Sequence, residues 1–457
     1  MSATLKSRSV LVESPTEIDP YYDGVWTRGT QIGWLSRTGA EHARVAGLGG
    51  LPARWSVDPV TALQRLTSSR NLPATVDALG AINQWRTISV EQLARVTGRP
   101  QLGRIGRRGE SLVSSLFAAG LVDFGFPVAP LRRPTMPHPG AVLLRPAMGA
   151  AFAHDIAPLL THAELVRITA GQGYRQARQA DRHNLLAVEF AMRAGEHCEV
   201  SAALGELTSS VDLLAYSGLG RTAPPGLQAS ADAVLVRPDG MRVAIEITAT
   251  VGNRFKRKVD TWAKTLAASP FDMSGLMVLF VEAATLERSE MTGRSVMYDV
   301  RKAVQGASRR FPGRHGDRVA DRMAVASWHD FFPARHLVDA EQFPLLRAER
   351  PSGTGDDVWH PIELLDPFSC PFTSEHAERL QSVISNSRTL AGVPASIVTR
   401  EHVAAPDLAM RRLREVGFDP LPVPPSATGA RRRVEVGIGV GAAREATVPA
   451  RLVAGRR

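Results

Sequence analysis

The sequence predicts an α/β protein whose largest unit is a mixed β-sheet covered by helices. Between residues 181 and 330 the hydrophobic pattern gives the order helix, strand, strand, strand, helix, strand, helix, strand. The early strands would form a meander and helices would join the later ones. Residues 238–240 (Pro-Asp-Gly) supply turn chemistry between two runs of alternating character. Residues 276–281 (LMVLFV) form a continuous apolar run, which is typical of a strand buried on both faces.

A smaller helical unit precedes this sheet. Apolar residues recur at helical spacing over 79–85, and residues 89–98 form a short helix with a serine cap and a glycine end. A further helix is expected over 110–119, followed by a strand and a wing over 121–145. This is the winged-helix order, in which the third helix enters the major groove of DNA. A plain three-helix packing module is the alternative.

The remaining segments have weaker patterns, and the last stretch is rich in Pro, Ala, Gly and Arg. We therefore expect five regions: an irregular N-terminal arm (1–70), a winged-helix DNA-binding domain (71–150), a mixed-sheet domain (151–334), a weakly structured C-terminal extension (335–419) and a disordered basic tail (420–457).

Composition favours a polyanionic partner and argues against a membrane protein. The 457 residues carry a net charge of +10, a balance that favours nucleic acid. No run approaches the roughly 18 to 20 apolar residues of a membrane span, and the N-terminus lacks the apolar core of a signal peptide. The two cysteines are far apart, which disfavours a disulfide scaffold or thiolate zinc site. We expect a cytoplasmic protein that binds DNA and no membrane.

Two carboxylates meet if the hairpin adopts the register that its turn predicts. A three-residue loop over 238–240 places Asp232 opposite Glu246, close enough to share a divalent ion. A shift of one residue would move Asp232 to the other face. An oxygen-rich site suits Mg²⁺ or Mn²⁺, which would activate water at a scissile phosphate. Glu189, on the preceding helix, is a candidate third metal ligand. The alternative is that these acids are ordinary surface and strand-end polar residues.

Lysine is rare in this chain yet clusters directly after the Glu246 strand. Only five of the 55 basic residues are lysine, and three of these lie within residues 256–264. Lys256 or Lys258 would position the water and offset developing negative charge. A solvated helix face is the alternative. Basic positions expected to contact DNA phosphates are Arg104, Arg107, Arg108, Arg132, Arg133, Arg254, Arg257 and Lys264.

An Asp followed by Glu-x-Lys on the next strand is the pattern of the PD-(D/E)XK nuclease-like superfamily, and this chain resembles it at Asp232 and residues 246–248. The resemblance implies a restriction-endonuclease-like mixed sheet with a metal-dependent site. Thr248 stands where the pattern has Lys, so Lys256 or Lys258 would have to supply the charge from the following helix. We keep Thr248 as a candidate site residue.

Three further stretches extend the likeness over residues 70–310. They are residues 142–151 (VLLRPAMGAA), residues 182–185 (RHNL), and residues 231–233 with 246–248 followed by Phe255, Lys258 and Trp262. In these the chain resembles the replication-relaxation family of bacterial mobile elements. The family's glutamate is usually followed by an acidic residue, and Thr248 departs from that pattern as well. The resemblance implies a DNA-associated role and partners among mobile-element replication or transfer proteins.

The sequence leaves three functions open. The first is a DNA-binding protein acting in the replication, transfer or maintenance of a plasmid or integrative element. The second is an active divalent-metal-dependent DNA endonuclease that uses Asp232, Glu246 and a lysine. The third is a protein-interaction adaptor with a relic nuclease fold. Cleavage that requires Mg²⁺ and Glu246 would single out the second.

Overall fold

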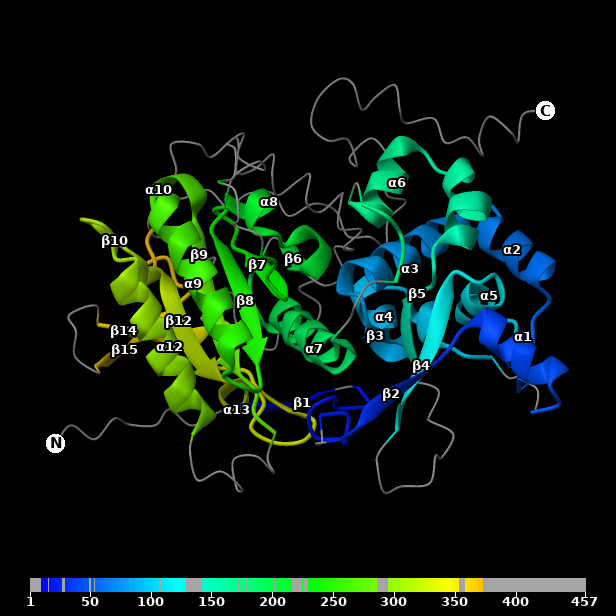
Figure 1. Ribbon diagram of the computed structural model, residues 1–457, viewed down its shortest axis with the longest axis horizontal. Helices are drawn as coiled ribbons and strands as arrows, with labels where there is room; N and C mark the ends of the chain where they lie inside the picture. The colour runs from blue at the N-terminus through cyan, green and yellow to red at the C-terminus, as the bar shows by residue number, and fades with distance from the viewer. Residues whose placement is uncertain are drawn as a thin grey trace.

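The computed structural model describes residues 10–14, 16–26, 29–48, 51–52, 54–106, 109–128, 142–170, 172–176, 180–200, 202–215, 224, 229–285, 295–352 and 358–372. These residues form two main β-sheets and two smaller two-stranded ones, and one long helix, α7 (Asp181–His197), lies between the main sheets (Figure 1). Within these ranges, no helix combines the length and apolar character needed to cross a membrane.

The larger sheet has seven strands in the order β15-β14-β12-β9-β8-β7-β6. They are β6 (Ala202–Gly205), β7 (Ala233–Val236), β8 (Arg242–Thr248), β9 (Leu276–Glu282), β12 (Met323–Ser327), β14 (Arg347–Pro351) and β15 (Trp359–Glu363). β6, β7 and β8 form an antiparallel meander, whereas β8, β9 and β12 run parallel. The crossovers between the parallel strands contain α9 (Asn253–Ala268) and α12 (Val296–Arg310), as parallel pairing requires.

The predicted α/β class and the element order over 181–330 agree with this sheet. β9 contains the predicted apolar run, and each of its seven residues is buried. The reason is its central place, with β8 and β12 hydrogen-bonded on either side. A strand covered on both faces keeps no polar positions, so its sequence reads as a continuous apolar run.

The smaller sheet has four strands in the order β2-β4-β5-β3. They are β2 (Gln31–Leu35), β3 (Ile88–Ser89), β4 (Val122–Val128) and β5 (Leu143–Pro146). α3 (Leu72–Trp85) precedes β3, and α4 (Val90–Thr97) and α5 (Leu112–Ala118) lie between β3 and β4 in the chain. Ser89 and Gln92 form a reciprocal capping box at the start of α4, and Gly98 ends it in the left-handed conformation.

The N-terminal segment is not the irregular arm expected from the sequence. β2 pairs along its whole length with β4, and β1 (Leu11–Glu13) pairs with β13 (Leu337–Asp339). Two helices follow β2, namely α1 (Arg37–Val45) and α2 (Pro59–Thr67). Each is short, so its periodicity is weak in sequence. Tertiary packing stabilises these helices, and patterns in a single sequence do not reveal such packing.

The helix expected to read DNA is buried. Every residue of α5 is covered, and α2 packs against it. Arg65 of α2 donates to the Ser115 hydroxyl (2.8 Å), and the Ser114 hydroxyl donates to the Arg54 carbonyl (2.6 Å). The prediction that this helix enters a major groove is therefore wrong for this structure, because α2 and its flanking segment occupy the surface that DNA would need.

The region after residue 334 is also more ordered than expected. β13, β14 and β15 lie within 337–363, and two of them complete one edge of the large sheet. The buried Arg237 guanidinium donates to the Cys370 carbonyl (2.9 Å) and so ties the end of this region to the β7–β8 turn. The expectation that this region is weakly structured was thus wrong for the described residues between 335 and 372. The rest of the C-terminal extension and the expected tail over 420–457 lie outside the described residues.

Helix α7 joins the two sheets through one continuous hydrophobic core. Its side chains contact α4 on one side and β6 and β7 on the other. The Gln92 amide of α4 donates to the Leu185 carbonyl (3.2 Å) and the Glu189 carboxylate (3.0 Å). At the start of α7, the Asp181 carboxylate accepts from Trp34 (2.9 Å). These contacts fix where the first turn of α7 meets the large sheet.

Candidate active site

The β7–β8 hairpin has the predicted register. Ala233 faces Ile245, and the backbone N–H of Asp232 donates to the Ile245 carbonyl (3.0 Å). Gly240 closes the turn with φ +90°, a conformation that glycine adopts at little cost. Asp232 therefore lies directly before β7, opposite Glu246 of β8, as the sequence pattern required.

Lys258 of α9 connects the two carboxylates. Its Nζ lies 3.3 Å from Asp232 Oδ1 and forms a closer ion pair with Glu246 Oε2. The helix is anchored by its apolar stripe, in which Val259 and Trp262 are fully buried. We call Asp232, Glu246 and Lys258 the carboxylate–lysine cluster. Three separate elements supply its members.

The second oxygen of Glu246 is held by Trp262, whose indole Nε1 donates to Oε1 (2.6 Å). The Glu246 residue is only 2% exposed. Both carboxylate oxygens are therefore fixed in place, which suits a group that must keep one orientation toward a ligand.

The second oxygen of Asp232 has two partners of its own. His183 Nε2, from the first turn of α7, lies 2.9 Å from Oδ2, and the Ile247 N–H donates to the same atom (2.7 Å). From the sequence, residues 182–185 are part of a family likeness, and His183 is expected to form a hydrogen bond at the helix start rather than to bind a metal. The contact was not predictable from spacing because 49 positions of chain separate His183 from Asp232 and only the fold brings them together.

Burial and neighbouring charges shift the pKa values of the three cluster members in different directions. Burial raises the pKa of Glu246 above the usual glutamate range; the neighbouring Asp232 adds to this and Lys258 opposes it. For Asp232, burial alone would raise the pKa, but His183 and Lys258 outweigh it and hold the pKa well below the usual range. Burial also opposes the charge on Lys258, yet the two carboxylates raise its pKa. Asp232 therefore stays deprotonated and Lys258 stays protonated, whereas Glu246 takes up a proton more readily than an ordinary glutamate.

The donor chemistry of the cluster fits a hard divalent cation. Two ion-pair contacts to one nitrogen keep the carboxylates of Asp232 and Glu246 well inside the roughly 8 Å beyond which they could not share one ion. The described residues contain no group of three or more His, Cys, Asp or Glu arranged around a common metal position. Asp232 and Glu246 would thus be the protein's oxygen ligands, and Mg²⁺ commonly completes its shell with water and substrate. The Lys258 ammonium already shows that this position favours positive charge.

Glu189 does not belong to this cluster. Its carboxylate accepts from Gln92 (3.0 Å) and from Arg193 Nε (2.9 Å), both at the contact between α4 and α7. We had expected a third metal ligand on this helix, but the helix presents His183, rather than Glu189, to Asp232. Glu189 is instead part of what we call the α7 cluster, made of Glu189, Arg193 and Glu196.

Among the contacts of the described residues, neither Thr248 nor Lys256 bonds to the two carboxylates. The Thr248 hydroxyl donates to the Thr250 carbonyl (2.9 Å) and so shapes the turn after β8. Lys256 is exposed on α9 and lines a groove with residues of α12. Lys256 and Lys258 are two positions apart, so their side chains leave the helix about 200° from each other around its axis. Of the lysines proposed for the site, the structure therefore brings only Lys258 to Glu246.

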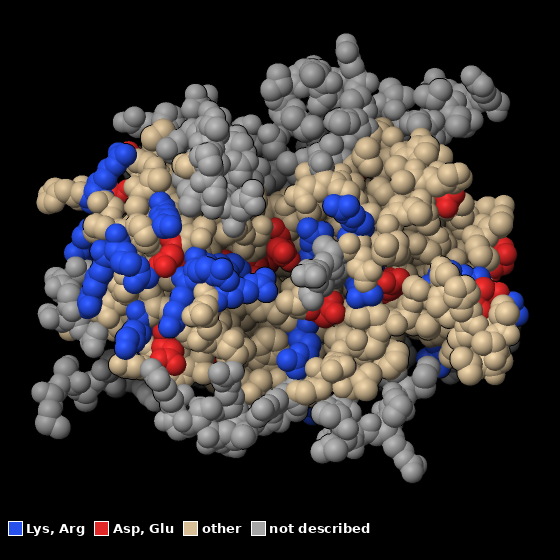
Figure 2. Space-filling model, viewed as in Figure 1, with Lys and Arg blue, Asp and Glu red and all other residues tan. Residues whose placement is uncertain are grey.

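The basic positions expected to contact DNA divide into two groups. Arg104, Arg254, Arg257 and Lys264 are exposed, and Figure 2 shows many Lys and Arg side chains on the face formed by α9 and α12. The Lys264 ammonium also lies 5.3 Å from the ring centre of Phe311. The other expected positions lie outside the described residues: Arg107, Arg108, Arg132 and Arg133.

No protein-family model, curated protein or solved structure matches this chain.

Proposed function

We propose that this protein is a divalent-metal-dependent DNA nuclease of the PD-(D/E)XK type, with its lysine moved from β8 to α9. The observation that carries the proposal is the contact of Lys258 with both Asp232 and Glu246. This is the trio of one lysine and two carboxylates that the pattern needs, assembled although Thr248 occupies the usual lysine position. The basic face of α9 and α12 supports a polyanionic substrate.

Each member of the cluster has a defined task in this proposal. Asp232 and Glu246 would hold Mg²⁺ or Mn²⁺, which when bound supplies an activated water and offsets charge on the scissile phosphate. Lys258, once released from the carboxylates, would place its ammonium against the phosphate oxygens, where negative charge develops in the transition state. His183 orients Asp232, and Trp262 orients Glu246. These two are positioning residues.

The setting that we propose is a plasmid or integrative element, on the strength of the likeness to the replication-relaxation family. The element order of α3, β3, α4, α5, β4 and β5 supports a winged-helix unit. In this chain such a unit would bind DNA through surfaces other than α5. Binding without cleavage, and a pure adaptor role, are the competing outcomes that the following experiment separates.

Nicking of a supercoiled plasmid, with Mg²⁺, Mn²⁺ or EDTA, tests the proposed reaction. We expect metal-dependent nicking that Asp232→Ala and Glu246→Ala abolish. Lys258→Met should lower kcat by about 10²- to 10³-fold, as expected when one charge-stabilising donor is lost. Arg44→Met is the matched control, because this exposed cation on α1 pairs only with the neighbouring Glu41 among the contacts of the described chain.

The outcomes are distinct. Nicking that survives Glu246→Ala would show a different site or a contaminating enzyme and would refute the proposal. DNA binding without nicking in any metal would favour the alternative of a DNA-binding protein that does not cut. No DNA binding at physiological salt would leave the adaptor.

A further inference from the structure

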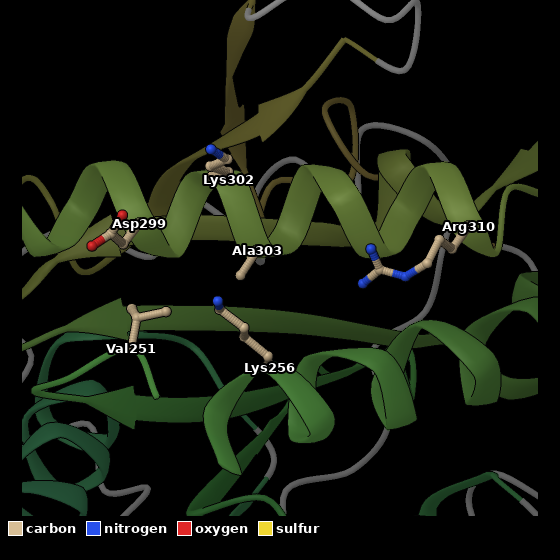
Figure 3. A pocket seen from close by; sticks show the side chains of 6 residues that line it. All are labelled: Val251, Lys256, Asp299, Lys302, Ala303 and Arg310. Carbon is tan, nitrogen blue, oxygen red and sulfur yellow. The ribbon is translucent and has the colours of Figure 1, made fainter. Parts of the chain in front are cut away.

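A groove of about 410 Å³ runs between α9 and α12, and none of its lining residues belongs to the carboxylate–lysine cluster. Figure 3 shows Lys256 rising from α9 toward α12 and the Arg310 guanidinium extending along the gap between the helices. The groove is lined by Val251, Lys256, Asp299, Lys302, Ala303 and Arg310. No task in the proposed reaction uses it.

The groove is strongly cationic. Three of its side chains are basic and one is acidic. In the described part of the chain, neither Lys256 nor Lys302 forms an ion pair, whereas Arg310 pairs with Asp260. Four of the five lysines in the whole sequence lie on α9 and α12, which concentrates compact, rotatable ammonium groups on this face. Three cations against the single lining carboxylate, Asp299, give the groove an excess of positive charge, which favours an anionic ligand.

Small residues keep the groove open on the α12 side. Ala303 and Gly306 fall three residues apart, on neighbouring positions of the helix surface. A Cβ atom at Gly306 would lie 3.3 Å from Arg310 Nη1, closer than most such contacts, so a larger side chain would displace the guanidinium. The position of the Arg310 guanidinium therefore depends on the absence of a side chain at Gly306.

The start of α9 adds positive potential at the same end of the molecule. Its N-cap is Gly252, whose missing side chain leaves the first-turn N–H groups uncapped, and the first turn holds no acidic residue. A Cβ at Gly252 would meet no atom within 4 Å, so the space beside it is open. A helix of 16 residues presents a partial positive charge at such an end.

We propose that this groove binds the DNA backbone next to the phosphate that is held at the carboxylate–lysine cluster. The proposal rests on the DNA substrate of the proposed function. Lys256 and Lys258 leave α9 on different sides within one turn, so a strand crossing the start of α9 meets both. Lys302 and Arg310 are eight residues apart, about 12 Å along α12, which exceeds the roughly 3.4 Å rise between phosphates of one DNA strand. The groove therefore has room for more than one phosphate.

Fluorescence anisotropy with a labelled DNA duplex, in EDTA and over a range of salt concentrations, tests this groove without any cleavage. The full-length Lys256→Gln/Lys302→Gln variant should bind about tenfold or more weakly near 0.1 M salt. Its slope of log affinity against log salt should fall by nearly two units, because about 0.9 is contributed per duplex phosphate contacted. The Arg44→Gln/Arg335→Gln variant loses the same charge from α1 and from the segment before β13, and it should bind like the wild type.

A second variant separates the shape of the groove from its charge. Ala303→Leu fills the space and changes no charge, and it should also weaken duplex binding. Unchanged affinity of the Lys256→Gln/Lys302→Gln variant, equal weakening in the control variant, or unchanged affinity of Ala303→Leu would each overturn the groove as the binding site. All of these measurements are independent of nicking. If the wild type fails to nick, the proposed reaction fails while the groove is still tested.

Discussion

Two clusters in this molecule place one cation between two carboxylates, and they differ in how they are built. In the α7 cluster, Arg193 pairs with Glu189 and Glu196, which are four and three residues away on the same helix. In the carboxylate–lysine cluster, Lys258 draws its partners from a strand start and from a neighbouring strand. Helical spacing encodes the first cluster locally, whereas only the fold creates the second.

The clusters also differ in access. Arg193 is completely buried, and its third guanidinium nitrogen, Nη2, donates to the Thr16 hydroxyl (2.9 Å), so no part of the guanidinium meets solvent. The Lys258 side chain is 29% exposed. A buried arginine whose donors are satisfied acts as a structural connector, here between α4, α7 and the N-terminal segment. A lysine with a solvent path can leave its carboxylates for a ligand, which is what a reactive site requires.

Breaking the α7 cluster should have the largest effect on stability. Arg193→Met leaves the buried Glu189 without its cation, whereas Glu196 keeps its ion pair with Arg95. Removing one partner of a buried ion pair costs about 3–5 kcal/mol. Urea denaturation followed by circular dichroism measures the change in the free energy of unfolding. Arg44→Met removes an exposed, solvent-screened pair instead and should leave the free energy of unfolding nearly unchanged. Equal effects of the two substitutions would contradict the contrast between the clusters.

The pH dependence of Arg193→Met should reveal which carboxylate is left uncompensated. Burial already raises the pKa of Glu189, and Arg193 is the strongest opposing influence. Without Arg193 the folded-state pKa rises further above the unfolded value, so the folded state binds the proton more tightly. The variant should therefore recover stability as the pH falls below the raised folded-state pKa, by up to about 1.4 kcal/mol per pH unit until the unfolded-state pKa is reached. The double variant Arg193→Met/Glu189→Gln should lack this recovery, and a recovery that persists in it would assign the effect elsewhere.

The contrast between the clusters also explains what the sequence could predict. The hairpin register depended on a local turn and on strand alternation, so Asp232 and Glu246 could be paired from sequence. The succession of main helices and strands along 181–330 followed from hydrophobic periodicity. The choice of Lys258 over Lys256 depended on which face of α9 meets β8, and the structure decided it.

Other features depended on contacts between distant segments. The packing of α2 over α5 could not be predicted from either helix, because apolar spacing shows which face of a helix is buried but not which segment covers it. The same holds for β13 to β15, whose order depends on partners elsewhere in the chain. Glu189 was misassigned because its charge suggested a ligand, while its true partner, Arg193, lies one turn further along the same helix.

The smallest expected effect on stability concerns the carboxylate–lysine cluster. Lys258→Met should cost only about 1 kcal/mol without metal, since Glu246 can take up a proton and Asp232 keeps His183 and the Ile247 N–H. Because the variant has no ammonium to compete for the two carboxylates, Mn²⁺ should stabilise it more than the wild type, by about 1.4 kcal/mol for each tenfold gain in affinity. Thermal unfolding with and without Mn²⁺ measures both quantities, with Glu246→Ala as the control that should not respond. A loss of stability as large as that of Arg193→Met would show that Lys258 has a structural role like that of Arg193. If Mn²⁺ stabilises neither the wild type nor the variant, the proposed metal site is refuted.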